Sequence, residues 1–309
     1  MKIVLGILIV LFFVLVFGGW FVFYKGCPRW KEMPWLMQEE IEKTKYKKYA
    51  GLIRRSHDWL CGHAAQDVFT MSEDGLKLHA LWIPAENPRG TVLFAHGYRS
   101  TYLVDFGGAM DLYHRQGFNL LIPDQRAHGK SEGKYITFGV KESEDMLCWL
   151  NYHNRTFGNY PVLLSGMSMG ASTMMYLADQ ALPENARGII VDCGFSSPYA
   201  ILDAVFRSVT HLPGWLCLWA TDIFAKLFAG FGLNEKDSRK VLAKNRLPII
   251  MVHGKADDFV PCAMSEEAYE LCTGEKQLLL VEDAGHGLSF LADKETYVAT
   301  VNAFIEKYF

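Results

Sequence analysis

The sequence predicts an α/β protein with a mostly parallel central sheet, helices on both faces, a helical insertion and an N-terminal transmembrane helix. Short apolar runs that end in turn residues alternate with helical stretches from Asp67 onward. Runs that are apolar throughout suit strands covered on both faces. Two early strands joined directly, followed by repeated strand–helix units, predict an antiparallel start to the sheet.

This alternation assigns a strand or a helix to most of the chain beyond residue 66. The expected strands are Leu76–Ile83, Thr91–Ala95, Asn119–Ile122, Val162–Leu164, Gly188–Val191, Ile249–Val252 and Gln277–Val281. The expected helices are Val104–Gln116, Val140–Asn154, Met169–Gln180, Met264–Cys272 and Tyr297–Phe309. The chain from Phe195 to Lys244 is longer than one connecting helix and carries apolar residues at helical spacing. Within an α/β domain of residues 66–309 we therefore expect a helical cap at about 196–245, where a lid over the site would be inserted.

The first residues predict a membrane anchor. Ile3 to Phe23 contains no charge and is rich in Val, Leu, Ile and Phe. A helix of that length spans roughly 30 Å, the thickness of the hydrocarbon layer. A cleaved signal peptide is the alternative, but its apolar region is shorter and ends in small residues, whereas this run ends in Trp20, Phe21, Phe23 and Tyr24. We expect residues 1–24 to be a retained single-pass anchor.

The orientation of this anchor rests on the basic residues beside it. Lys2 stands alone before the span, and several Lys and Arg follow it. The positive-inside rule then places the domain in the cytoplasm, but a large following domain can override the rule, so the side stays open. In the next segment, residues 25–65, the stretch from Trp30 to Gly62 has an amphipathic helical pattern. We expect it to pack on the domain or to lie at the lipid headgroups.

Composition excludes several classes of protein. With 50% hydrophobic and 21% charged residues the chain can bury a core and is not of the disordered class. A net charge of -3 disfavours nucleic acid as the main partner. The 7 cysteines are scattered, without the spacing of a metal site, and their odd number favours free thiols. We expect no metal and no cofactor.

A candidate nucleophile lies in Gly166-Met167-Ser168-Met169-Gly170, which fits the pattern G-x-S-x-G. The pattern follows the expected strand Val162–Leu164 and opens the expected helix Met169–Gln180, the context it requires. A sharp turn there exposes the serine hydroxyl near a helix N-terminus, and flanking glycines prevent collisions. We predict that Ser168 is a nucleophile.

A serine nucleophile needs a base, and the base needs a carboxylate. His286 lies between glycines immediately after the last expected strand. Asp257 and Asp258 follow the preceding strand, and Asp192 ends the strand before that one. The carboxyl ends of parallel strands meet at one edge of the sheet, so Ser168, His286 and an aspartate can converge there. The residues alone leave the choice among the three aspartates open.

An oxyanion hole requires two backbone donors. His96-Gly97-Tyr98 ends the strand Thr91–Ala95, and Gly97 lets the backbone approach a reacting carbon. We predict that the backbone N–H groups of Tyr98 and Met169 are the two donors.

From Asp67 to Phe309 the chain resembles the α/β-hydrolase superfamily, in its esterase, monoglyceride-lipase-like and serine-aminopeptidase-like branch. The resemblance rests on these motifs: His96-Gly97, Asp124-Gln125-Arg126-Ala127-His128-Gly129-Lys130-Ser131, Gly166–Gly170, Gly254-Lys255-Ala256-Asp257 with Val260-Pro261, and Gly285-His286. It implies that Asp257 is the acid and ranks Asp258 second. Ala127 stands where the family commonly has Gly, in a structural loop. The segment Asp192–Phe195 is similar to bacterial, often membrane-tethered members of undefined substrate.

The expected function is hydrolysis of carboxylic esters through a Ser168–Asp257–His286 triad and an acyl-enzyme. The apolar insertion favours a small-molecule or lipid-like ester as the substrate. A serine peptidase or an acyltransferase would use the same triad. The alternative from another class is a non-catalytic, membrane-tethered binding protein, and an intact set of three residues argues against it.

Overall fold

The computed structural model describes residues 2–29, 47 and 50–309. Its centre is one 8-stranded sheet of order β1-β2-β4-β3-β5-β6-β7-β8. The strands are β1 Gln66–Met71, β2 Lys77–Ile83, β3 Gly90–Ala95, β4 Phe118–Pro123, β5 Val162–Met167, β6 Ala186–Asp192, β7 Ile249–Gly254 and β8 Lys276–Val281. β2 pairs antiparallel with both β1 and β4, and every pair from β4 to β8 is parallel. The predicted sheet, with its antiparallel start, is confirmed.

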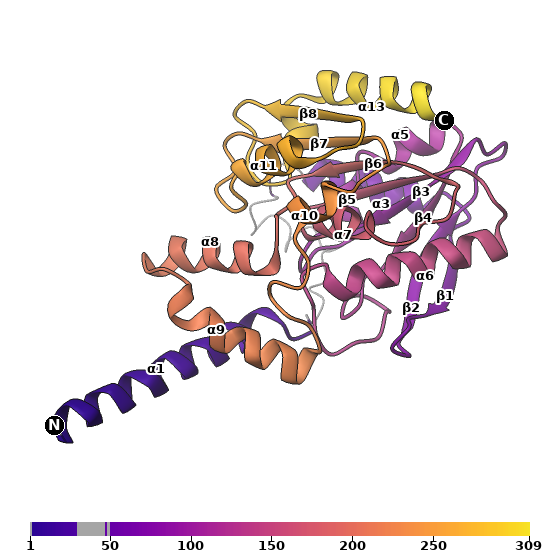
Figure 1. Cartoon of the computed structure of the whole chain (residues 1–309). Helices are drawn as coiled ribbons and strands as arrows, with labels where there is room; N and C mark the ends of the chain where they lie inside the picture. Colours follow the sequence, from indigo (N-terminus) through magenta and orange to yellow (C-terminus); the bar gives the residue numbers. More distant parts are fainter. Residues whose placement is uncertain (1, 30–46, 48–49) are drawn as a thin grey trace.

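Helices cover both faces of the sheet (Figure 1). One face packs against α3 Ala50–Cys61, α4 Tyr102–Phe106, α5 Met110–Arg115, α12 Ser289–Ala292 and α13 Lys294–Tyr308. The other packs against α6 Val140–Thr156, α7 Met169–Leu177, α10 Ser238–Leu242 and α11 Ala263–Leu271. Strands β3 to β7 are apolar because both of their faces are buried in this way.

Two local expectations differ from the structure. β1 was not among the expected strands, because it lies at the edge of the sheet and has no apolar run. The expected helix Val104–Gln116 is broken between α4 and α5 at Gly107 and Gly108. A Cβ atom on Gly107 would lie 2.5 Å from Ser56 Oγ, and one on Gly108 would lie 2.5 Å from the Phe290 ring. Because Gly107 and Gly108 have no side chains, Ser56 of α3 and Phe290 of α12 can pack closely at the point where the helix breaks.

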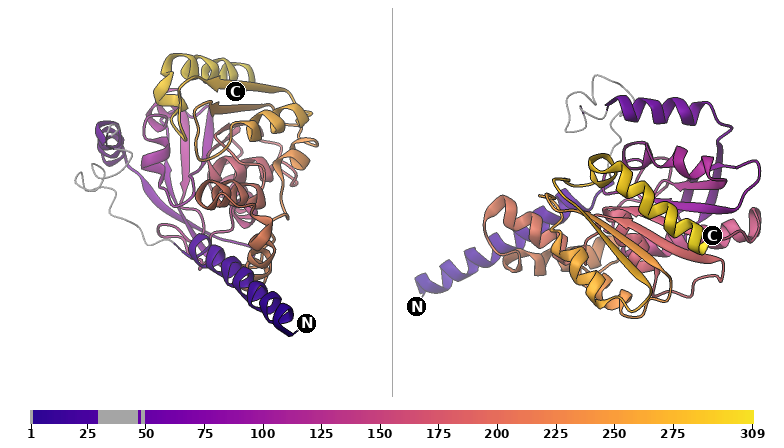
Figure 2. Two further views of the ribbon diagram at one scale, coloured as in Figure 1. Left: turned by 90° about the vertical axis from the view of Figure 1, so that its left-hand side faces the viewer. Right: turned by 90° about the horizontal axis from the view of Figure 1, so that it is seen from above.

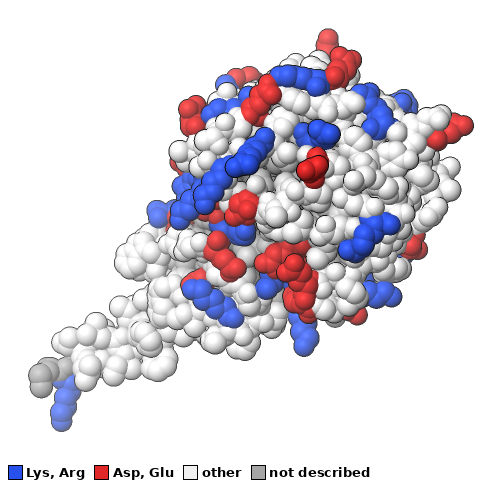
Figure 3. All heavy atoms as spheres, turned by 45° about the vertical axis from the view of Figure 1, so that its right-hand side comes forward, with Lys and Arg blue, Asp and Glu red and all other residues white. Residues whose placement is uncertain are grey.

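Helix α1, Lys2–Gly26, leaves the α/β body as a long rod (Figures 1 and 2). Most of its apolar side chains are exposed, and it is long and apolar enough to cross a membrane. Figure 3 shows this rod almost free of charge beside a body that carries both signs. Of the amphipathic segment Trp30–Gly62, the structure describes chiefly α3, which packs on the body through Ile53 and Leu60; residues 30–46 and 48–49 lie outside the described part.

The predicted helical insertion is present between β6 and β7. It begins with α8 Pro198–Thr210 and α9 Trp215–Phe224, continues as the π-helical turn η2 Ala225–Ala229, and ends with α10. Ser197 caps α8 by accepting a hydrogen bond from the Ala200 N–H. Helix α9 packs against α1 rather than closing over the body as a lid would.

Candidate active site

Ser168 sits on the sharp turn between β5 and α7. Its φ of 54° and ψ of -116° are strained for a non-glycine residue. A Cβ atom on Gly166 would lie 2.3 Å from the Gly170 carbonyl oxygen, and one on Gly170 would lie 1.8 Å from the Ala95 carbonyl oxygen. Neither approach tolerates a side chain, so the turn needs both glycines. The turn lifts the Ser168 hydroxyl to the carboxyl edge of the sheet.

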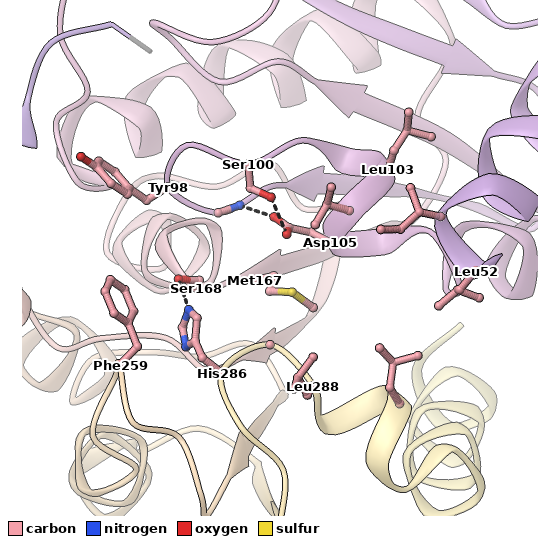
Figure 4. A pocket seen from close by; sticks show the side chains of 15 residues that line it. Leu52, Tyr98, Ser100, Leu103, Asp105, Met167, Ser168, Phe259, His286 and Leu288 are labelled. Atoms are coloured by element: carbon pink, nitrogen blue, oxygen red, sulfur yellow. Dashed lines mark hydrogen bonds between the residues drawn. The ribbon is translucent and has the colours of Figure 1, made fainter. Parts of the chain in front are cut away.

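His286 and Asp257 reach Ser168 from the loops after β8 and β7. His286 Nε2 lies 2.9 Å from Ser168 Oγ (Figure 4). His286 Nδ1 lies 2.8 Å from Asp257 Oδ2. Among the three aspartates left open by the residues alone, only Asp257 contacts His286 in the described part of the chain. Asp258 lines a separate groove, and Asp192 accepts a hydrogen bond from Ser289. The structure thus brings together one serine, one histidine and one carboxylate.

Asp257 is held as an anion although its side chain is inaccessible to solvent. Burial by itself raises the pKa of this carboxyl group, but hydrogen bonds from His253, His286 and the Val260 N–H outweigh burial and hold the pKa well below its usual range. His253 Nε2 lies 3.2 Å from the same oxygen that contacts His286. His253 Nδ1 in turn lies 2.6 Å from Ser265 Oγ. His253 Nε2 also lies 3.0 Å from the Val260 carbonyl oxygen, so a second, buried histidine is fixed beside the acid.

Of the two predicted oxyanion donors, Tyr98 lies in the loop after β3 and Met169 is the first residue of α7. Within the described part of the chain, the backbone N–H groups of Tyr98 and Met169 donate no hydrogen bond to another residue. The loop itself is held by Asp105, whose Oδ2 accepts the Gly97 N–H at 2.6 Å and whose Oδ1 accepts the Ser100 hydroxyl at 2.7 Å (Figure 4). Burial raises the pKa of Asp105. Two free N–H groups beside Ser168 are what a developing oxyanion requires.

A cavity of about 160 Å³ opens beside Ser168. It is mainly apolar, and its lining includes Leu52 and Ile53 of α3, Leu103 of α4, Met167 of β5 and Leu288. None of its lining residues comes from the insertion, so the element expected as a lid does not form this wall. A volume of this size is close to the roughly 150 Å³ that accepts a benzene ring in a protein interior. The cavity can hold a small apolar group next to the serine.

The chain is similar in sequence to known proteins. Residues 86–241 match the family model Hydrolase_4, described as serine aminopeptidase, S33. The chain is also 31% identical to the uncharacterized protein YqkD of Bacillus subtilis (strain 168). The aligned 224 residues cover 72% of this chain and 73% of YqkD. The chain belongs to this α/β-hydrolase family. It is also 25% identical to YfhR of Escherichia coli (strain K12), over 72% of this chain and 74% of that protein.

Solved α/β hydrolases share the fold of this hydrolase. The Pyrococcus furiosus esterase Pf2001 superimposes with a TM-score of 0.65 at 24% identity, covering 80% of this chain and 93% of that one. The esterase EaEST from Exiguobacterium antarcticum superimposes with a TM-score of 0.58 at 19% identity, covering 78% and 100%. The predicted α/β-hydrolase fold is confirmed.

This α/β hydrolase also has ligand-type atoms that a metal could use. Cys193, Asp257 and His286 each offer one atom, and these atoms lie within 4.8 Å of one another. The His286 and Asp257 atoms are already joined by a hydrogen bond, and burial raises the pKa of the Cys193 thiol well above its usual value. A protonated thiol is a poor metal ligand. The cluster is therefore explained by the hydrogen-bonded chain to Ser168.

Two further features of this hydrolase were missed in the sequence. Asp105 and His253 each support a site residue through contacts that no short motif encodes. The end of α1 also reaches the site: the Tyr98 hydroxyl donates to the Gly26 carbonyl at 2.8 Å, and the Arg99 guanidinium donates to the Lys25 carbonyl at 2.6 Å. The apolar helix and the loop that carries the predicted oxyanion donor are thus directly connected.

Proposed function

We propose that this hydrolase is a serine carboxylic-ester hydrolase with Ser168 as nucleophile, His286 as base and Asp257 as the orienting acid. The observation that carries the proposal is the continuous hydrogen-bond chain from Asp257 through His286 to Ser168, whose hydroxyl end lies beside an apolar cavity. Such a chain activates a hydroxyl that is otherwise a poor nucleophile.

The reaction follows from these positions. His286 Nε2 takes the hydroxyl proton as Ser168 Oγ attacks the ester carbonyl carbon, and the carbonyl electron pair moves onto oxygen. The backbone N–H groups of Tyr98 and Met169 stabilise that oxyanion. Its collapse expels the alcohol, which takes the proton from His286. A water molecule then attacks the acyl-enzyme by the same route, which releases the acid and restores the Ser168 hydroxyl.

The lining of the cavity favours an ester over a peptide with a free amino terminus. An aminopeptidase site needs a carboxylate available to the substrate ammonium group. Among the described residues that line this cavity, Asp105 is the one acidic residue, and its two oxygens already accept hydrogen bonds from Gly97 and Ser100. An uncharged acyl group suits the remaining apolar wall.

We also propose that α1 is a retained membrane anchor, with residues 25–65 linking it to the α/β domain of 66–309. Its C-terminal end supports this proposal, because Phe23 is buried against the body and two backbone carbonyls of the helix end accept hydrogen bonds from Tyr98 and Arg99. Cleavage after the apolar run would remove these contacts. An intact N-terminal peptide, found by mass spectrometry of the membrane fraction, is the expected result.

The catalytic proposal is tested with a fluorophosphonate probe and a panel of esters of increasing acyl length. Wild-type protein should label and Ser168→Ala should not. Asp257→Asn should lower kcat by about 10⁴-fold, as loss of the orienting carboxylate does in serine proteases. Asp258→Asn is the matched control, since its side chain lies in another groove, and should keep wild-type activity. Equal labelling of wild type and Ser168→Ala would refute the proposal, and a reactive Ser168 with no ester turnover would favour a peptidase or a transferase.

A further inference from the structure

Helices α8 and α9 of the insertion, with the turn η2, expose large apolar side chains on an otherwise ordinary protein surface. The exposed fractions rise to 74% for Val209, 71% for Leu227 and 62% for Trp215. The full set comprises Val209, Leu212, Trp215, Trp219, Ile223, Leu227 and Phe228. Soluble monomers rarely leave so many large apolar residues together in water. The surface therefore requires an apolar partner.

Helix α9 packs closely against α1. The Thr221 hydroxyl donates to the Gly19 carbonyl oxygen at 3.0 Å. Gly19 allows this approach, since a Cβ atom there would lie 2.5 Å from Ala220 Cβ. A small residue at the contact and a hydroxyl bonded across it are typical of helix pairs inside membranes. In both views of Figure 2 the insertion lies beside the part of α1 that is nearer the body.

Two ring contacts show over what length of α1 the insertion packs. Trp219 stacks on Phe12 with centroids 5.9 Å apart, and Phe228 contacts Phe23 at 5.8 Å. Phe12 precedes Phe23 by eleven residues, and at ~1.5 Å per residue this separation is about 16 Å along the helix axis. That distance is about half of a hydrocarbon layer of roughly 30 Å. If α1 spans the bilayer, Trp219 is held well inside the leaflet next to the body.

Charges in this insertion are few and paired. Between residues 198 and 230 the charged side chains are Asp203, Arg207, Asp222 and Lys226. Arg207 contacts Asp203 at 2.6 Å, and Lys226 contacts Asp222 at 2.6 Å. Asp203 and Arg207 lie within α8, whereas Asp222 and Lys226 lie in the last turn of α9 and in η2. Charged side chains in membranes pair with one another, and long Lys and Arg chains can extend to the headgroups.

We propose that the α8–α9 hairpin, with η2, is immersed in the leaflet next to the α/β body and contacts phospholipid acyl chains. The inference rests on the proposed membrane span of α1. Acyl chains rather than a second copy of the protein are the partner, because α9 lies beside α1 (Figure 1) and exposed apolar side chains of the two helices, such as Trp219 and Phe12, are in contact. The protein thus has two membrane-embedded elements, of which only α1 crosses the bilayer.

Photo-crosslinking of the full-length chain in vesicles of phosphatidylcholine and phosphatidylglycerol tests this proposal. Benzoylphenylalanine replaces Trp215 or Phe228 in separate proteins, and intact mass is measured after irradiation. The matched control replaces Phe69, an aromatic residue on β1 that is 40% exposed on the body. The expected result is a mass increase of one phospholipid at positions 215 and 228 and none at 69. Absence of lipid adducts at 215 and 228, or an adduct with the mass of a second chain, would overturn the proposal.

A further variant separates this inference from the proposed anchor. Phe13 is 64% exposed on α1, and benzoylphenylalanine at that position should also gain one phospholipid. Adducts at 13 without adducts at 215 or 228 would reject the immersed hairpin and leave the anchor standing. Absence of adducts at all three positions would reject both. Neither result depends on esterase activity, so the catalytic proposal is tested independently.

Discussion

Removal of the Asp105 carboxylate should lower turnover without weakening substrate binding. Asp105 accepts the Gly97 N–H and the Ser100 hydroxyl, and these two bonds hold the loop of Tyr98, the proposed oxyanion donor. In Asp105→Ala both donors lose their acceptor. In Asp105→Asn both can stay bonded, because the amide oxygen accepts the Gly97 N–H while the Ser100 hydroxyl turns to accept from the amide nitrogen.

The size of the effect follows from these bonds. A buried donor left without an acceptor costs about 1–3 kcal/mol, and the loop can avoid that cost only by moving. Because an oxyanion donor contributes about 3–4 kcal/mol, its partial displacement should lower kcat by roughly 10- to 100-fold. KM should change little, since the oxyanion exists only in the transition state. Asp105→Asn should stay within about tenfold of wild type, as should Ser100→Ala, which removes only one of the two bonds.

Steady-state hydrolysis of a short-chain ester measures both constants, and a thermal melt of each variant reports on folding. An Asp105→Ala protein that melts early yet keeps wild-type kcat would show that the carboxylate serves stability alone. If Asp105→Asn lost as much activity as Asp105→Ala, the negative charge rather than the hydrogen bonds would be the important property. Either outcome contradicts the reasoning above.

Two further predictions concern stability. Burial raises the pKa of Asp192 to about 6, and one of its oxygens has no partner among the described residues, so the folded state disfavours its anion. A pKa shift from 3.8 to about 6 destabilises the folded wild type by about 3 kcal/mol once pH has risen through this range. The melting temperature of Asp192→Asn should therefore rise relative to that of wild type between pH 4 and pH 8. Parallel plots of melting temperature against pH for the two proteins would contradict this prediction. In detergent, Gly19→Ala should cost about 1–3 kcal/mol by overpacking α1 against α9. Gly18→Ala, whose Cβ atom would lie 3.5 Å from Cys217, should be neutral, and equal melting temperatures for the two variants would count against this contact.

Much of the sheet could be predicted because its inner strands are uniformly apolar. β3, β4, β5 and β7 are buried on both faces, and this burial is visible in the residues themselves. β1 escaped prediction because an edge strand exposed to solvent has no such run. The break between α4 and α5 was also not predicted, because it depends on the close packing of Ser56 and Phe290 on the two glycines, and both residues are distant in sequence.

The same distinction applies to the candidate site. Ser168 and His286 lie in short glycine-flanked motifs at strand ends, where local sequence carries the signal. Asp257 was separated from its neighbours only by resemblance, and the contact with His286 supports that choice geometrically. Asp105 and the α3 wall of the cavity come from packing between elements that are remote in the chain. No short pattern reports such packing.

The insertion lies against α1 rather than over the cavity beside Ser168. A lid would contribute side chains to the cavity beside Ser168, yet the cavity is lined without it. The insertion instead packs on α1, and α1 ends against the loop of Tyr98 and Arg99 through its two terminal carbonyl contacts. The Tyr98 ring also stacks on Phe138 at 5.4 Å, so its side chain is fixed between the anchor and the body. Because the same residue carries the proposed oxyanion donor, the proposed membrane span of α1 would also set the position of this loop relative to the bilayer surface.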